Sequence, residues 1–164
     1  MPGDMEIIAK PQMPLIEMRY SFDAPRELVF KAHIDPAAVA QWWGPANLTT
    51  TVESLEARPG GLWRMVQRDA DGNEFGFHGV YHDVVAPERL VYTFEFEGMP
   101  GHVLLETLTF EERDGRTILR DVAAFQSVED RDGMLQSGME SGARESMERL
   151  TELLRKMGVG AASS

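Results

Sequence analysis

The chain has 164 residues, enough for one domain with a single core, and its content of 43% hydrophobic and 26% charged residues is that of a soluble globular protein. Its formal net charge of −11 disfavours nucleic acids and anionic membrane surfaces as partners, because such a field repels phosphate groups. The absence of cysteine excludes disulfides, thiolate catalysis and cysteine-based zinc sites.

The N-terminal half of the chain begins with a proline-containing segment, residues 1–14, which we expect to be an arm or an irregular edge. It has no basic region followed by an apolar run, and no stretch approaches the roughly 20 apolar residues of a membrane span. We therefore expect a cytoplasmic protein. Residues 15–22 alternate weakly and predict a first strand.

Two short helices are predicted next. Asp23 is the expected cap of the first helix, with Pro25 in its first turn. The second helix lies in the segment DPAAVAQWWGP (35–45), where Asp35 is the cap and Pro36 occupies the first helical position. Gly44 and the proline after it end this helix.

Six strand-like segments follow, separated by turn sequences such as RPGG, ADGN and RDGR. They cover residues 49–57, 62–69, 74–85, 89–97, 102–112 and 117–125. Short connections of this kind join successive strands into an antiparallel meander. An apolar stripe at spacings of three and four then predicts one long helix over residues 127–157, with Ser127 as its cap. Residues 158–164 are expected to be a disordered tail.

The predicted fold is therefore α+β, with a curved antiparallel sheet of six to seven strands, two short helices after the first strand, and a long C-terminal helix across the concave face. One domain is expected, over residues 15–157. A helix of about 10 Å diameter cannot fill the hollow of such a sheet. Large side chains must fill the remaining space, or it is a pocket.

Five separated segments resemble one known family: FDAPRELVFKAHIDPAAVAQWWGP, RPGGLWR, DGNEFGFHGVYHDVVAPERLVYTFEF, ETLTFEERDGRT and the last helix. They look like the Hsp90-ATPase-activator-homologue branch of the START-like, helix-grip (SRPBCC) superfamily. The resemblance implies a helix-grip fold with a hydrophobic cavity, and members bind lipids, polyketides, hormones or partner proteins, or act as cyclases. Eukaryotic Hsp90 activators also carry an N-terminal domain, and only about 14 residues precede the first strand here, so a chaperone partner is the weakest of these expectations.

The residues expected to line or gate the pocket are mainly aromatic, as in many small-molecule sites. The set comprises Trp43, Trp63, Met65, Tyr92, Phe94, Met99, Glu106, Phe125 and Met139. Adjacent helical residues point about 100° apart, so Trp42 and Trp43 cannot face the same way, and the sequence does not decide which one faces the cavity.

Two acidic residues lie on strand faces that otherwise carry apolar residues. Glu106 alternates with Leu104 and Leu108, and Asp121 alternates with Leu119. An inward carboxyl group costs free energy unless it is paired or protonated, so it either holds a polar ligand group, acts as an acid or base, or forms a buried ion pair with an arginine such as Arg64. Glu106 is the weak catalytic candidate.

No metal site or cofactor is expected. His78 and His82 share a strand face but lie about 13 Å apart, too far to share one ion. Gly138 and Gly142 lie one helical turn apart, and they allow either the close approach of a strand or a space for a ligand.

Three functions remain. The favoured one is binding of a small hydrophobic or amphipathic ligand between sheet and helix. The alternatives are a cyclase-like or hydrolytic enzyme that uses Glu106, and a protein-interaction module such as a chaperone partner. Self-association is left open, because the edge strands of an open sheet need a cover.

Overall fold

One antiparallel sheet forms the frame of the molecule. The computed structural model describes residues 5–162, with side chains as far as residue 158. The strands are β1 (Met5–Ile8), β2 (Leu15–Phe22), β3 (Thr49–Leu55), β4 (Leu62–Arg68), β5 (Glu74–Val85), β6 (Arg89–Phe96), β7 (Val103–Arg113) and β8 (Arg116–Ala124). They pair in the order β1-β2-β8-β7-β6-β5-β4-β3, so the meander predicted for the last six strands is confirmed.

The sheet has eight strands, and the prediction of six to seven was wrong. The additional strand is β1, which lies inside the segment expected to be an arm. It pairs with β2 from Met5 opposite Tyr20 to Ile8 opposite Glu17. A four-residue strand between proline-containing segments has too short an alternation to stand out in the sequence.

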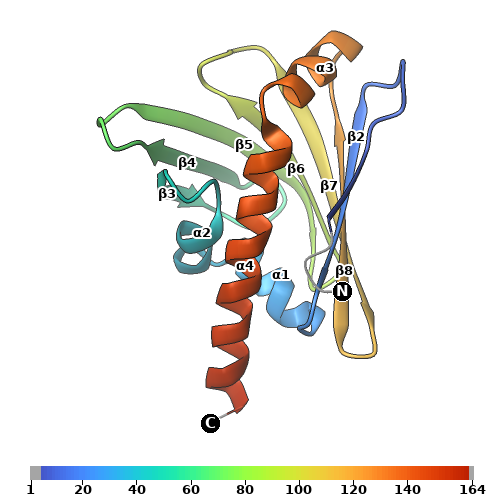
Figure 1. Ribbon diagram of the computed structural model, residues 1–164, viewed down its shortest axis with the longest axis vertical. Coiled ribbons are helices and arrows are strands. Elements are labelled where there is room, and N and C mark those ends of the chain that lie inside the picture. Colours follow the sequence, from blue (N-terminus) through green and yellow to red (C-terminus); the bar gives the residue numbers. More distant parts are fainter. Residues whose placement is uncertain (1–4, 163–164) are drawn as a thin grey trace.

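Four helices accompany the sheet: α1 (Arg26–Ile34), α2 (Pro36–Trp42), α3 (Val128–Gln136) and α4 (Met139–Ala162). Figure 1 shows α4 crossing the concave side of the sheet, with α2 beside its middle and α1 beside its C-terminal half. On α4, Met147, Leu150 and Leu154 recur at spacings of three and four and are buried against the core. This arrangement confirms the predicted α+β helix-grip architecture.

The single helix predicted over residues 127–157 is two helices. Gly138 has a φ of 86°, a left-handed conformation that glycine adopts without the steric cost of a side chain, and the chain changes direction there. The break was missed because the apolar stripe continues through it. The helix after the break runs on to Ala162, so the expected tail overlaps its last residues, and residues 163–164 lie outside the described chain.

The predicted caps of the helices are confirmed in two cases of three. Asp35 accepts from the amide of Ala37 at 3.0 Å, and Ser127 accepts from that of Asp130 at 3.1 Å. Asp23 does not cap α1. The amide of Arg26 at the start of that helix donates instead to Glu112 Oε1 at 2.8 Å, so a strand side chain supplies the acceptor.

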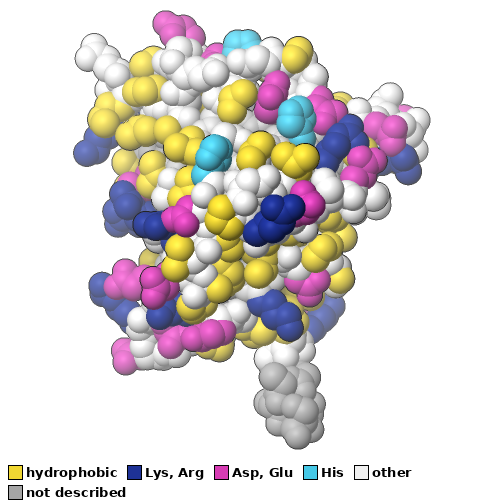
Figure 2. Space-filling model, turned by 180° about the vertical axis from the view of Figure 1, so that it is seen from behind, with side chains coloured by type: hydrophobic (Ala, Val, Ile, Leu, Met, Phe, Trp, Pro, Cys, Tyr) yellow, Lys and Arg dark blue, Asp and Glu magenta, His cyan; other side chains and the backbone are white. Residues whose placement is uncertain are grey.

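The two faces of the sheet differ in their surroundings. The inner face packs on α1, α2 and α4 around side chains such as Tyr20, Val29 and Leu150, each at most 2% exposed. Figure 2 shows the opposite, outer face, where apolar side chains lie among acidic and basic ones. None of the helices in residues 5–162 combines the length and hydrophobicity needed to cross a lipid bilayer.

Candidate functional site

A pocket of about 300 Å³ lies between the inner face of the sheet and α4. Its helical wall comes from α4, with Met139, Gly142, Ala143 and Met147, and its opposite wall comes from β2, β6, β7 and β8. The loop after α2, including Gly44 and Pro45, completes the lining. Most of the lining side chains are apolar, which is typical of small-molecule sites.

The two adjacent tryptophans have separate roles. Trp42 is 5% exposed, and its indole Nε1 donates to the main-chain oxygen of Ala32 at 2.9 Å, which ties α2 to α1. Trp43 is less buried, lines the pocket, and packs edge-on against Phe77 with ring centroids 5.2 Å apart. Both residues border the pocket, and Trp43 is the one that joins the aromatic side chains of the sheet, through Trp63 and Phe77.

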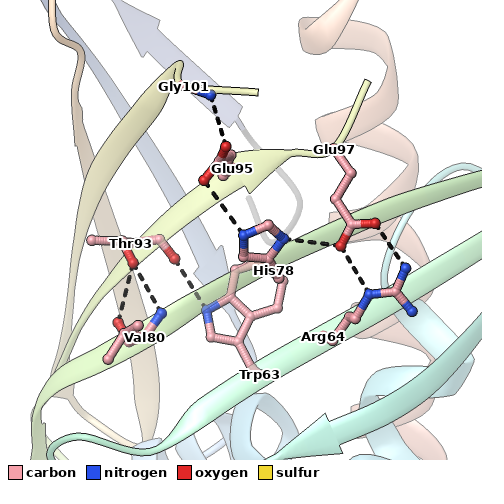
Figure 3. Close-up of polar contacts among 8 residues, drawn as sticks. All are labelled: Trp63, Arg64, His78, Val80, Thr93, Glu95, Glu97 and Gly101. Atoms are coloured by element: carbon pink, nitrogen blue, oxygen red, sulfur yellow. Dashed lines mark hydrogen bonds and ion pairs between the residues drawn. The ribbon is translucent and has the colours of Figure 1, made fainter. Parts of the chain in front are cut away.

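The Trp63 side chain packs over Gly79 of the neighbouring strand β5, beside the pocket. Its Nε1 donates to the main-chain oxygen of Thr93 at 3.1 Å, across β5 (Figure 3). A Cβ on Gly79 would lie 2.6 Å from that nitrogen and 1.8 Å from the oxygen, so a side chain at that position would collide with both. Next to the indole, the amide of Val80 donates to the Thr93 hydroxyl oxygen at 2.9 Å, in place of a main-chain hydrogen bond between β5 and β6.

This indole anchors an aromatic wall on the inner face. Trp63 lies 6.0 Å from Tyr92 and 5.8 Å from Phe94, and Phe77 lies 5.6 Å from Phe94, measured between ring centroids. These distances suit edge-to-face and tilted aromatic contacts, which stabilise the wall beyond its buried area.

The polar end of the pocket is built from three adjacent strands. Tyr92 on β6 lies directly opposite Glu106 on β7, and Asp121 on β8 is the diagonal neighbour of Glu106 on the same face, since Asp121 pairs with Leu108. Both residues line the pocket, and each residue as a whole is half-buried. The prediction that both residues face inward is confirmed.

Burial governs the protonation of this pair. It raises the pKa of Glu106 above its ordinary value, although hydrogen bonding to Asp121 and Tyr92 acts in the opposite direction. Burial and the neighbouring Glu106 carboxylate raise the pKa of Asp121 well above its usual range. Asp121 is therefore the residue that retains a proton as pH rises. Its Oδ1 atom is buried and has no hydrogen-bond partner among the described residues.

His33 is a pocket residue that the sequence analysis did not select. It lies on α1, and its Nδ1 is 2.8 Å from the main-chain oxygen of Val29. A carbonyl oxygen only accepts, so Nδ1 carries the hydrogen and Nε2 keeps its lone pair. Burial lowers the pKa of His33 to about 4, which keeps the ring neutral at pH 7. No pattern in the sequence singles it out.

The structure brings most of the predicted site residues together. Trp43, Tyr92, Phe94, Glu106, Phe125 and Met139 all line the 300 Å³ pocket. Trp63 and Met65 line a smaller adjoining cavity of about 50 Å³, which shares Trp43, Tyr92, Phe94 and Glu106 with the first. Residues such as Met18, Phe77 and Ala143 were not predicted, because their selection depends on the path of α4 over the sheet.

Met99 lies apart from the other predicted site residues, and its role as a gate stays a prediction. It is 55% exposed and lines neither cavity. The turn that carries it is held by the amide of Gly101, which donates to Glu95 Oε2 at 2.8 Å (Figure 3). Because Glu95 points to the outer face, this bond ties the turn to the side of the sheet away from the pocket.

A second group of polar side chains lies on the outer face (Figure 3). Arg64 donates to both oxygens of Glu97, at 2.7 and 2.8 Å, and His78 Nδ1 lies 2.9 Å from the same carboxylate. Arg64 holds the pKa of Glu97 at about 2. An ion pair between Arg64 and Glu106 is thereby excluded, since the two lie on opposite faces. Within residues 5–162, no group of three or more His, Asp and Glu side chains is placed to hold a metal ion.

Comparison with known proteins identifies the family. The model of the activator of Hsp90 ATPase homolog 1-like protein family matches residues 23–155. The chain belongs to this family. Its fold is that of the START-like superfamily, and family and fold together support a ligand-binding or cyclase-like function in general.

Individual relatives agree on the fold. A crystal structure of a Rhodobacter sphaeroides protein is 25% identical, with a TM-score of 0.87 over 93% of this chain and 99% of that chain. DynU16, from the dynemicin biosynthetic locus, is 20% identical, with a TM-score of 0.62 over 87% of this chain and 47% of its own. Uncharacterized protein C1711.08 of Schizosaccharomyces pombe is 30% identical over 106 residues, which are 64% of this chain. The match spans 28% of the length of that curated relative.

Proposed function

We propose that this protein binds a small amphipathic molecule in the pocket between the sheet and α4. The observation that carries the proposal is a space of about 300 Å³ that is apolar over most of its lining and has two adjacent carboxyl groups at one end. Small-molecule sites combine these features, with apolar walls that hold the ligand and a few polar groups that orient it.

The layout of the pocket defines how such a ligand lies. Its apolar part packs between the aromatic wall and the methionine-rich side of α4, where Met139 and Met147 provide flexible contacts. Its polar end reaches Glu106 and Asp121, because these groups would otherwise face an apolar space without a partner for Asp121 Oδ1.

The methionines offer a direct test. The chain can be labelled with ¹³C at its methionine methyl groups and titrated with N-phenyl-1-naphthylamine, an uncharged fluorescent probe. We expect the methyl signals of Met18, Met139 and Met147 to shift, since these residues line the pocket. The exposed Met13 and Met99 are internal controls. Shifts confined to the two controls, or no shift at all, would rule out the proposal.

A cyclase-like reaction in the same pocket is the second candidate. It is favoured by one observation, that Asp121 retains a proton beside Glu106 and Tyr92, so an acid and a potential base lie together in an apolar site. Carboxyl ¹³C chemical shifts measured against pH test it. If Glu106 and Asp121 both titrate at or below their ordinary values of about 4, the pair cannot act as an acid and base at neutral pH.

A further inference from the structure

We propose that the pocket selects ligands whose polar end is a protonated amine, in preference to a neutral hydroxyl or an anionic group. This inference rests on the proposed ligand-binding function and names the chemical class of ligand. It is drawn from three features of the pocket: its charge, the Asp121 oxygen that has no partner among the described residues, and its aromatic wall.

The lining of the pocket carries acids without a compensating cation. Glu106 and Asp121 are its carboxyl groups, and no described lining residue is Lys or Arg. The other titratable side chains near the pair are Tyr92 on β6 and the neutral His33 on α1, while β2 and α4 contribute only uncharged side chains. A carboxylate or phosphate head would meet like charge in a site of low dielectric constant, which is unfavourable.

The unpartnered oxygen needs a hydrogen-bond donor. Asp121 Oδ1 is buried and has no hydrogen-bond partner among the described residues, and Tyr92 lies directly opposite Glu106 rather than opposite Asp121. An ammonium group has three N–H donors, so it can bridge Glu106 and Asp121 and reach Oδ1 at the same time. A hydroxyl group has one donor and satisfies only one of these acceptors.

The aromatic wall also favours a cation. Tyr92 belongs to both the polar end and the wall, and Phe94 and Phe77 continue the wall from there. The faces of such rings attract an ammonium group, and more strongly where water is excluded. Apolar ligands without charge gain nothing from this interaction.

The test compares three probes of nearly equal shape by isothermal titration calorimetry at pH 7: 1-naphthylmethylamine, 1-naphthylmethanol and 1-naphthoic acid. We expect the amine to bind about tenfold more tightly than the alcohol, a factor that corresponds to about 1.4 kcal/mol. The acid should bind most weakly. Lowering the pH should reduce the preference for the amine, because Glu106 and His33 then gain protons while Asp121 already carries one, and should leave binding of the alcohol unchanged.

The double variant Glu106→Gln/Asp121→Asn keeps the size of both side chains and removes their charge. It should lose most of the preference for the amine over the alcohol, because only the aromatic wall then favours the cation. Glu148→Gln, a change of charge at one exposed residue of α4, should keep the preference. If the alcohol or the acid matches the amine on the wild-type protein, the inference is overturned and ligand binding stands. If none of the three probes binds, both proposals fall. The wild-type series decides the matter even if the double variant does not fold.

Discussion

Gly142 offers a way to fill the pocket from the helix. It lies in the first turns of α4 and lines the pocket, and a Cβ placed on it would have no neighbour within 4 Å. Of the two explanations considered for this glycine, space for a ligand is the one that its surroundings favour. The replacement Gly142→Leu adds four carbon atoms to that space without a collision at the first of them.

The expected effect on stability has three parts. Leucine in place of glycine within a helix favours folding by about 0.8 kcal/mol. Burying the new side chain over roughly half of its surface adds about 1 kcal/mol. Fixing its rotamer costs about 0.5 kcal/mol. The net gain of about 1.3 kcal/mol corresponds to a rise in Tm of roughly 3–5 °C for a domain of this size.

Thermal denaturation followed by circular dichroism measures this gain, and titration with N-phenyl-1-naphthylamine measures the loss of ligand space. We expect the Kd for the probe to rise about tenfold or more, since about 1.4 kcal/mol of lost contact is enough for that factor. Gly133→Leu is the matched control, because Gly133 is helical and exposed and does not line the pocket. A lower Tm for Gly142→Leu, or unchanged binding of the probe, would refute the reasoning.

Four further substitutions test the pocket and its supports. Asp121→Asn should raise the free energy of unfolding at pH 7 by about 1 kcal/mol, because the folded protein keeps a neutral side chain without the cost of ionising it in a buried site. The sign follows from linkage, because an acid whose pKa is raised by folding makes the protein lose stability as pH increases above its unfolded pKa of about 3.9. Urea titrations from pH 4 to 7 should therefore give a flatter dependence of stability on pH for the variant than for the wild type. An unchanged slope would count against a raised pKa. Trp42→Phe should destabilise the folded protein by about 2 kcal/mol, since it removes the hydrogen bond to Ala32. Trp43→Phe should change stability little and weaken binding of the probe. Equal effects of the two variants on stability would contradict the division of roles. Gly138→Ala should lower stability by about 1 kcal/mol because of its positive φ, and a rise in Tm would show that α3 and α4 are one continuous helix.

Strand alternation predicted the inner face of the sheet correctly. Trp63 and Met65 are buried as expected, and Glu106 faces the pocket because Leu104 and Leu108 on the same strand pack inward. A period of two residues fixes the face once one member of the row is known. The candidate acid could therefore be found without coordinates.

The relation between the two acids could not be found in this way. Alternation turns Glu106 and Asp121 inward one at a time, but their pairing depends on the register of β7 against β8, which places Leu108 opposite Asp121. The sequence of a hairpin allows more than one register, and the turn conformation selects among them. Asp114 and Gly115 both have positive φ in the turn between these strands, which sets this register.

The remaining differences between the predicted and the observed site depend on contacts between elements that are distant in the sequence. The two tryptophans after Val39 are chemically equal, and only the path of α1, which presents the oxygen of Ala32, buries Trp42 rather than Trp43. Met99 lies in a turn whose sequence, GMPG, is compatible with either side of the sheet. Glu95 holds that turn to the outer face.

The most direct test of the binding site is a crystal structure of the protein with 1-naphthylmethylamine. We predict the naphthyl group between α4 and the aromatic wall, with its nitrogen at a hydrogen-bond distance of about 2.7–3.0 Å from Glu106 and Asp121. Electron density for the probe only on the outer surface, with side chains filling the space beside Gly142, would contradict the account.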